Sequence, residues 1–563
     1  MSEDPDPSIV TSSLFSEQEK KAFSDAKALD IEIAKDYWSN CTKYVNLSRM
    51  INRWSRSEVG SVFLDYSAFQ EHLSPLDFDR LLSLSLSGLD INENNIVDSQ
   101  EISSSPSLDM PVGSDAQAMA RWNFVPYQIL NSSFKIGVVA FHIYGINRVE
   151  FFLDGSSTPT VVTTPTLNSE SDTIEYWISV DPSGMASGLH TLTAIAYPNV
   201  GLPRSLSIDP ITAKHGQYNM CFIADPDNAI PRLEKYISPS GSDITGNGSS
   251  SNPFLSPMKA AKSIALANGG FADGGYINLL AGNHHFGTYA FSLLTVTRDH
   301  WLTIRPAPGV ASADCPIVTA TGGIRTKLVK FENITIKPNT TVAPLLGSPT
   351  NEFCCGWVDG CDFMGQGRTV NSKFMANWDY MFITSCNLTD SRDGFSGDLV
   401  RDCHIGLIGA DAFTGSGLVI NSTCRKIDRT GTIFHPDFYQ LYAAGKLLEN
   451  RILYGAELLE FSETQGLFSG AIGAPGIKDI AFVNVKLHTG PIMRAFQFVC
   501  PTNHMLVQGC TLRGSMVWRY DGGFTGKNIV FRGTTLTRSN GSARSSVGAV
   551  PSDTPITGVL YFD

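Results

Sequence analysis

Three patterns of hydrophobic and polar residues follow one another along the chain, and the first is helical. Ser16 with Glu19 matches a capping box, the usual start of a helix. Apolar residues then recur three or four positions apart at Ala22, Ala26, Leu29, Ile33 and Tyr37. This spacing predicts the apolar face of an α-helix. A second helix is expected from Ser74, a plausible N-cap followed by Pro75, to Gly88. We therefore expect a helical segment over residues 1–109.

The second pattern, over residues 110–212, alternates with a period of two. It is clearest at Val149, Phe151 and Leu153, at Ile174, Tyr176 and Ile178, and at Leu189, Thr191, Thr193 and Ile195. Alternation of this kind predicts half-buried β-strands. With an Asp154-Gly155 turn and a late strand opened by Gly188, the segment resembles an immunoglobulin-like β-sandwich.

The third pattern is a repeat that occupies the C-terminal half. Short segments such as FENITI, TSCNL, RDCHI and QGCTL recur about every 25 residues, a period typical of one coil of a solenoid. Aligning their central small or polar residue gives Asn333, Cys361, Cys386, Cys403, Ser422, Asn450, Asn484, Cys510 and Thr534. We expect this row to point inward, with four of the cysteines packing as small hydrophobic residues.

The segment before the repeats resembles the entry of pectate-lyase-like right-handed parallel β-helices. A strand at Tyr236 precedes a Gly- and Asn-rich loop, an Asn252-Pro253-Phe254 turn, a helix from Ser256 and a second strand over 276–280. A solenoid needs such a cap because its first coil would otherwise expose an open sheet edge. The sequence thus predicts a mainly β protein: helical segment 1–109, immunoglobulin-like sandwich 110–212, linker 213–232 and right-handed parallel β-helix 233–563.

Composition narrows the classes of function. The formal net charge is −12 and only 17% of residues are charged, which argues against nucleic-acid binding. No run of about 18 apolar residues occurs, so we expect no membrane insertion. The first residues, MSEDPDPSIV, lack the positive and apolar regions of a secretion signal. The 11 cysteines show no disulfide framework spacing, which favours reduced, buried thiols.

Residues 90–101, DINENNIVDSQE, resemble an EF-hand or dockerin-type calcium loop. Oxygen donors fall at the required loop positions 1, 3, 5, 7, 9 and 12, namely Asp90, Asn92, Asn94, the carbonyl of Ile96, Asp98 and Glu101. The following SSSPSLDMP cannot form a long exiting helix, so a structural Ca²⁺ is expected rather than a switch. The other interpretation is a solvated acidic turn.

Candidate chemistry lies where a carboxylate stands beside a phenylalanine once per repeat. These pairs are Asp393 with Phe395, Asp411 with Phe413, Asp437 with Phe438 and Glu460 with Phe461. Stacked coils would bring neighbouring carboxylates to about 4.8 Å and alternate ones to about 9.6 Å. These distances bracket those of retaining and inverting glycoside hydrolases.

Two sets of residues follow from this spacing. The catalytic candidates are Asp411, His435, Asp437 and Arg494, with Arg494, Arg425 or Lys426 as the base of a calcium-bridged lyase; the candidates for glycan contact are Asp393, Gln440, Glu460 and Glu463. Catalysis, non-catalytic glycan contact and ordinary turn chemistry around core phenylalanines all remain open. The glycan strip requires Phe395, Phe413, Phe438 and Phe461 to face outward.

Two classes of function compete. The order of helical anchor, sandwich and β-helix resembles structural proteins of tailed marine phages. That resemblance implies a tail or baseplate component of a virion, bound to other virion proteins through its N-terminal region and contacting host-surface polysaccharide. It also implies a homo-oligomer, a trimer in many phage β-helices. The alternative is a secreted, calcium-dependent polysaccharide lyase or glycoside hydrolase.

Overall fold

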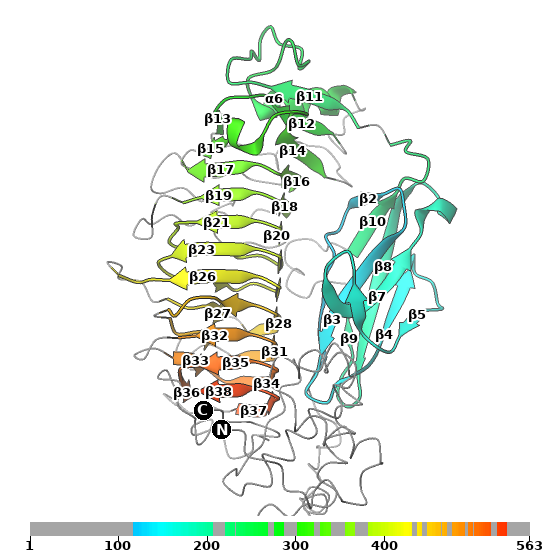
Figure 1. Cartoon of the computed structure of the whole chain (residues 1–563). Coiled ribbons are helices and arrows are strands. Elements are labelled where there is room, and N and C mark those ends of the chain that lie inside the picture. The colour runs from blue at the N-terminus through cyan, green and yellow to red at the C-terminus, as the bar shows by residue number, and fades with distance from the viewer. Residues whose placement is uncertain are drawn as a thin grey trace, which may run out of the picture.

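The computed structural model describes residues 116–206, 220–230, 232–267, 275–286, 301–319, 327–338, 355–365, 367, 381–430, 436–441, 447–462, 464–469, 476–489, 494–498, 500–518 and 526–537. It is mainly β, as predicted. Two parts lie side by side (Figure 1): a two-sheet domain (residues 116–224) and a coil domain (residues 232–537). The predicted helical segment 1–109 and its calcium loop lie outside the described residues.

The two-sheet domain packs one β-sheet on another. The first sheet has the order β1 (Met119–Trp122), β3 (Phe134–Phe141), β7 (Thr173–Val180) and β6 (Thr166–Asn168). The second has the order β2 (Gln128–Leu130), β10 (Met220–Ala224), β8 (Gly188–Pro198), β4 (Ile146–Leu153) and β5 (Thr160–Val162), with β9 (Arg204–Ser205) on β8 and a 3₁₀ turn at Pro182–Gly184. Val138 and Tyr176 of the first sheet are buried against Val149, Phe151 and Ala194 of the second. Strand β10 lies within the predicted linker but belongs to this domain, because it pairs with β8 and β2.

The coil domain consists of long parallel sheets, consistent with the predicted β-helix. Sheet A contains β11 (Glu234–Ile237), β12 (Tyr276–Leu279), β14 (Leu302–Pro306), β16 (Lys327–Glu332), β18 (Cys355–Asp359), β20 (Met381–Thr384), β22 (Leu399–Arg401), β25 (Leu418–Ile420), β28 (Leu448–Tyr454), β31 (Ile477–Val483), β34 (Thr502–Gln508) and β37 (Gly526–Arg532). Sheet B contains β13 (His284–Phe286), β15 (Ile317–Thr319), β17 (Thr335–Pro338), β19 (Asp362–Met364), β21 (Asn387–Thr389), β23 (His404–Ile408), β26 (Thr423–Ile427), β29 (Glu457–Leu458), β32 (Lys486–His488), β35 (Thr511–Arg513) and β38 (Thr535–Thr537). Sheet C contains β24 (Phe413–Thr414), β27 (Tyr439–Leu441), β30 (Leu467–Ser469), β33 (Arg494–Phe498) and β36 (Ser515–Trp518).

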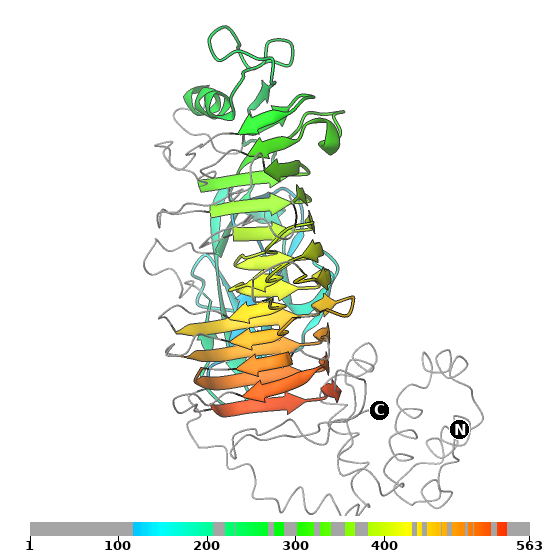
Figure 2. The ribbon, with the colours of Figure 1, turned by 90° about the vertical axis from the view of Figure 1, so that its left-hand side faces the viewer.

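A helix covers the N-terminal end of this stack, as predicted (Figure 2). Helix α6 (Pro257–Ala267) begins after Ser256, whose Oγ accepts a hydrogen bond from the Lys259 amide at 3.2 Å. Its apolar face, including Ala261 and Ile264, is buried against Ile237 and Ile277 of the first coils. Burial of that face is what stabilises so short a helix.

The register of the coils shows that the residues predicted to point inward belong to different positions of the coil, mainly the corner itself and the residue after it. From β16 onward, one residue at each corner between sheets A and B has a positive φ, between 47° and 66°: Asn333, Gly360, Ser385, Asp402, Asn421, Gly455, Asn484, Gly509 and Gly533. The residue that follows each of them points inward and is buried: Ile334, Cys361, Cys386, Cys403, Ser422, Ala456, Val485, Cys510 and Thr534.

The prediction was therefore right for the four cysteines, Ser422 and Thr534, and wrong for three asparagines. Asn333 and Asn484 occupy the corner because asparagine tolerates the left-handed conformation. Asn450 lies inside β28, where its side chain bonds the backbone of Ala120. The eight cysteines whose side chains the structure describes are buried, and none of them forms a disulfide.

The two-sheet domain packs on the outer face of sheet A. Met119, Val125, Val139 and Ile143 of the two-sheet domain share an apolar cluster with outward residues of sheet A. The sheet A contribution is Leu328, Trp357, Phe382, Leu399, Leu418, Ile420, Ile452, Tyr454, Ala481, Val483, Leu506 and Val530, with Trp301 just before β14. The indole Nε1 of Trp301 donates to the carbonyl of Pro126 at 2.7 Å. This face of the coil domain is thus covered by the chain itself.

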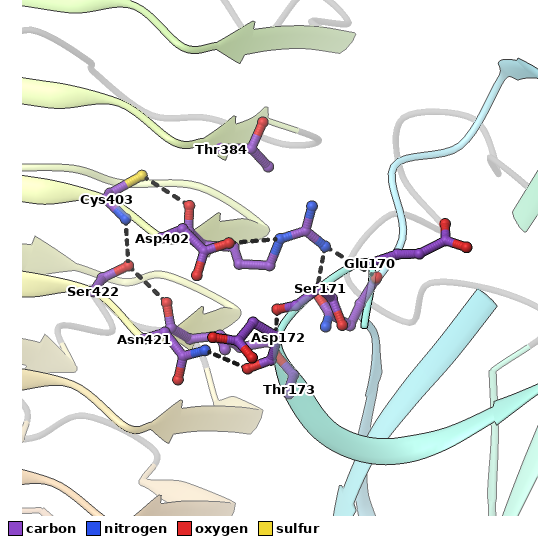
Figure 3. Close-up of polar contacts among 12 residues, drawn as sticks. Glu170, Ser171, Asp172, Thr173, Thr384, Asp402, Cys403, Asn421 and Ser422 are labelled. Carbon is purple, nitrogen blue, oxygen red and sulfur yellow. Dashed lines mark hydrogen bonds and ion pairs between the residues drawn. The ribbon is translucent and has the colours of Figure 1, made fainter. Parts of the chain in front are cut away.

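Polar contacts at the same interface are shown in Figure 3. The Arg401 Nη1 donates to Asn123 Oδ1 at 2.9 Å, and Asn421 Nδ2 donates to the Asp172 carbonyl at 3.0 Å. Burial raises the pKa of the Asp402 carboxyl; the Arg401 guanidinium opposes this shift and the Asp172 carboxylate adds to it. These contacts fix the position of one domain on the other.

Candidate functional site

Three carboxylates predicted to stack lie in one row at the corner between sheets B and C. Phe395 forms a parallel β-bridge with Phe413 of the next coil. Phe413 in turn pairs with Tyr439, and Tyr439 pairs with Leu467. The residues two positions earlier in each coil are Asp393, Asp411, Asp437 and Gln465. We call Asp393, Asp411 and Asp437 the acid row.

Backbone hydrogen bonds join the coils at this corner and hold the acid row in register. The Gly394 amide donates to the Asp411 carbonyl at 2.7 Å, and the Ala412 amide donates to the Asp437 carbonyl at 2.9 Å. A Cβ on Gly394 would lie 2.0 Å from the Ala412 carbonyl oxygen, so this close approach of two coils requires glycine.

The three carboxyl groups have different environments. Asp437 is fully buried; its Oδ2 accepts from Gln440 Nε2 at 3.0 Å, while its amide donates to Asp411 Oδ1 at 3.0 Å. Asp393 is partly exposed, and its Oδ2 lies 3.2 Å from Arg392 Nε. Asp411 is half-buried between the other two.

Burial raises the pKa of the Asp411 carboxyl well above its usual range. The neighbouring carboxylates of Asp437 and Asp393 raise it further, while the Asp437 amide and the Arg392 guanidinium oppose the shift. A carboxyl group whose pKa is raised in this way is suited to general acid chemistry.

A strip of outward residues lies on sheet C, immediately after the acid row. The paired strands place Ser396, Thr414, Gln440 and Phe468 one above the other on neighbouring coils, and all four are partly exposed. Hydroxyl, amide and aromatic groups in such an order can bond and stack on sugar rings. We call these four residues the outer strip. Sequence reasoning missed Ser396, Thr414 and Phe468, although alternation in Phe413-Thr414 and Leu467-Phe468 was the available signal.

The predicted platform of four phenylalanines does not form. Phe395, Phe413 and Phe438 are fully buried and pack inside the coil domain. Phe461 is 46% exposed, but it follows β29 on the sheet B side, where the Arg513 guanidinium lies over its ring at 5.7 Å. The inward positions are set by the pairing of sheet C, and phenylalanine fills the interior there.

The other predicted site residues are separated from the acid row or lie outside the described residues. Glu460 is exposed, and its Oε1 lies 3.8 Å from Nε of the equally exposed Arg425. Arg425 and Lys426 belong to β26 of sheet B. Arg494 begins β33, but its side chain is not among the described parts. His435 and Glu463 lie outside the described residues, as do the calcium-loop residues Asp90, Asn92, Asn94, Ile96, Asp98 and Glu101.

Metal binding, membrane crossing and similarity to known proteins give no further indication of function. Within the described ranges, no three His, Cys, Asp or Glu side chains are grouped so that they could hold a metal ion. In the same part of the chain, no helix is long and apolar enough to cross a membrane. Comparison of the chain with protein-family models, with curated proteins and with solved structures finds no match.

Proposed function

We propose that the chain contacts a polysaccharide along the outer strip and the partly exposed members of the acid row, Asp393 and Asp411, while the buried Asp437 holds Gln440 in place. The observation that carries the proposal is the alignment of Asp393, Asp411 and Asp437 on successive coils, beside hydroxyl, amide and aromatic groups of sheet C. Carboxylates accept hydrogen bonds from sugar hydroxyls, and aromatic faces pack on sugar rings.

The position of these residues favours a polymer over a small ligand. Side chains at equivalent positions recur about every 4.8 Å from coil to coil, so a row of contacts runs along the stack and can meet successive sugars. Strands β27, β33 and β36 lie on the side of the coil domain away from the two-sheet domain (Figure 1). A long chain can therefore lie along them while the opposite face stays covered.

The setting we propose rests on the resemblance stated above. The coil domain would be a right-handed, pectate-lyase-like β-helix and the two-sheet domain an immunoglobulin-like sandwich, in a tail or baseplate protein of a phage virion. The N-terminal 109 residues would bind other virion proteins, the assembly would be a homotrimer, and the polysaccharide would belong to the host surface. The apolar cluster and the polar contacts that join the two domains suit a protein that carries load at a particle surface.

A second candidate function is cleavage of the same polymer, in a secreted calcium-dependent lyase or a glycoside hydrolase. The raised pKa of Asp411 between two other carboxylates favours it, because a glycosidase needs one protonated and one ionised carboxyl group. Asp411 would then protonate the leaving oxygen.

Replacing Asp411 by asparagine separates the two candidates. On a glycan array, the D411N variant should keep or moderately weaken binding if the row only contacts sugar, whereas turnover of the bound glycan should fall by at least about 100-fold if Asp411 is a general acid. Asp362→Asn, an exposed aspartate of sheet B, is the matched control and should change neither. If the wild-type chain binds no polysaccharide, the proposed function is wrong.

The calcium loop also stays a prediction with a direct test. Calorimetry of the full chain should detect Ca²⁺ binding that Glu101→Ala abolishes, because position 12 supplies the bidentate carboxylate of such loops. An unchanged isotherm in this variant would contradict the prediction. Ser103→Ala, just outside the loop, should leave the isotherm unchanged.

A further inference from the structure

A buried charged cluster joins the two-sheet domain to sheet A, apart from the acid row. We define the histidine cluster as His142 and Arg204 of the two-sheet domain with Asp479 of β31 and His504 of β34. Their exposures are 1%, 4%, 2% and 0%. Arg204 Nη2 lies 2.7 Å from Asp479 Oδ2, and His504 Nδ1 lies 2.7 Å from Asp479 Oδ1. The rings of His142 and His504 meet across the interface with centroids 4.5 Å apart and planes tilted by 53°.

The hydrogen bonds of His142 leave no place for a second ring proton. Its Nδ1 accepts from the Tyr144 amide at 3.2 Å, so the ring proton is on Nε2, which faces the Ala116 carbonyl at 3.4 Å. A proton added to Nδ1 would point at the Tyr144 N–H. The site cannot widen easily, because even a Cβ on Gly201 would lie 2.9 Å from His142 Nε2.

The charges around His142 also oppose a positive ring. Burial, then His504 and the Arg532 guanidinium, lower the pKa of His142 to about 3, while the hydrogen bond to the Ala116 carbonyl opposes the shift. Asp479 is the compensating carboxylate, but it already accepts from Arg204, His504 and the Gln117 amide. The remaining charged or titratable groups that face the cluster are Arg121, Glu449, Lys478 and Tyr144.

We propose that the histidine cluster is a pH-sensitive latch: proton uptake by His142 releases this end of the two-sheet domain from sheet A. Once the interface opens, water solvates the ring, and His142 takes a proton near its ordinary pKa of about 6.5. The closed state therefore binds fewer protons than the open state. The latch holds fully above about pH 6.5 and weakens progressively as the pH falls below that value.

Release concerns the end of the interface at β31 and β34 and not its whole length. The two-sheet domain contributes Met119, Val125, Val139 and Ile143 to the shared apolar cluster, and Tyr127, Phe141 and Tyr144 are partly buried against it. A hydrophobic interface of this extent keeps the two domains together. Trp301 and Trp357, near β14 and β18 at the other end, therefore stay buried when the latch opens.

Hydrogen exchange of the full chain between pH 7 and pH 4 tests the latch. The amide of Ala120, which donates to Asn450 Oδ1 at 2.9 Å across the interface, reports opening, and segment 423–427 of β26 in sheet B reports global unfolding. After correction for intrinsic exchange, the opening constant at residues 116–125 should rise about tenfold per pH unit below pH 6. Protection of segment 423–427 should stay unchanged.

Two variants and a control make the result specific. His142→Gln should remove this tenfold dependence. His504→Gln can still donate to Asp479 and should keep the onset near pH 6.5, because the pKa of His142 in the open state sets it. His285→Gln, an exposed histidine of β13, should behave as the wild type does. The proposal is overturned if His142→Gln keeps the wild-type slope, if His504→Gln abolishes the pH dependence, or if both segments lose protection together.

Discussion

Replacing Phe413 by alanine is expected to lower the free energy of unfolding of the coil domain by about 3–5 kcal/mol. Phe413 is fully buried, and its ring meets Phe438 edge-on with centroids 5.5 Å apart. Removing it leaves a cavity between coils whose backbones are held by parallel pairing on both sides, so the space cannot close easily. Urea unfolding of the full chain, followed by circular dichroism of the β signal, measures the loss.

Phe461→Ala is the control for this prediction. Phe461 belongs to the same set of four carboxylate-linked phenylalanines in the sequence, but it is 46% exposed. Its truncation should cost no more than about 0.5 kcal/mol, the usual range for surface positions. Equal costs for the two substitutions would mean that Phe413 is not part of the interior.

Replacing Arg204 by methionine is expected to destabilise the attachment of the two-sheet domain by about 3–5 kcal/mol. The variant keeps an unbranched apolar stem in place of the arginine stem but leaves the Asp479 carboxylate, whose side chain is 3% exposed, without its arginine partner. Exchange protection of residues 116–125 at pH 7 reports this loss. The double variant Arg204→Met/Asp479→Leu should recover part of it, because no charge is then buried alone.

An exposed ion pair provides the comparison. Arg148 Nε lies 2.7 Å from Glu150 Oε1, but the arginine side chain is 35% exposed. Arg148→Met should therefore cost about 0–1 kcal/mol. A similar cost for Arg148→Met and Arg204→Met would contradict the importance assigned to burial.

The repeat in the sequence predicted the stacked coils well, because a solenoid interior demands the same small or apolar residue once per coil. The repeat pattern did not separate the inward residues from the positive-φ residues at the corners between sheets A and B (the corner row), since asparagine and cysteine are both small. Only the backbone distinguishes them: Asn333 has a φ of 52°, whereas Cys361 points inward one position after the corner at Gly360. Attachment of the second domain to sheet A was not predicted either. The outward residues of sheet A made its strands apolar on both faces, and this pattern alone does not show what covers the outer face.

The candidate site was predicted in part for a related reason. Asp393, Asp411 and Asp437 each stand two residues before a buried aromatic residue, namely Phe395, Phe413 and Tyr439. The pairing of these aromatic positions stacks the three aspartates in one row. Glu460 stands beside a phenylalanine too, but the turn between β29 and β30 is long, so Gln465 takes the equivalent place. The length of such turns is not encoded in a carboxylate–aromatic pair.

The corner row limits which coils of this protein can be deleted, duplicated or exchanged in an engineered chain. Each asparagine of the row is followed in the next coil by a glycine: Asn333 by Gly360, Asn421 by Gly455 and Asn484 by Gly509. A Cβ at these glycines would lie 2.3, 2.7 and 2.3 Å from the asparagine Oδ1 below. Coils are therefore not interchangeable modules. A chimera that deletes, duplicates or transplants a coil keeps its geometry only if every asparagine at the junction still meets a glycine above it.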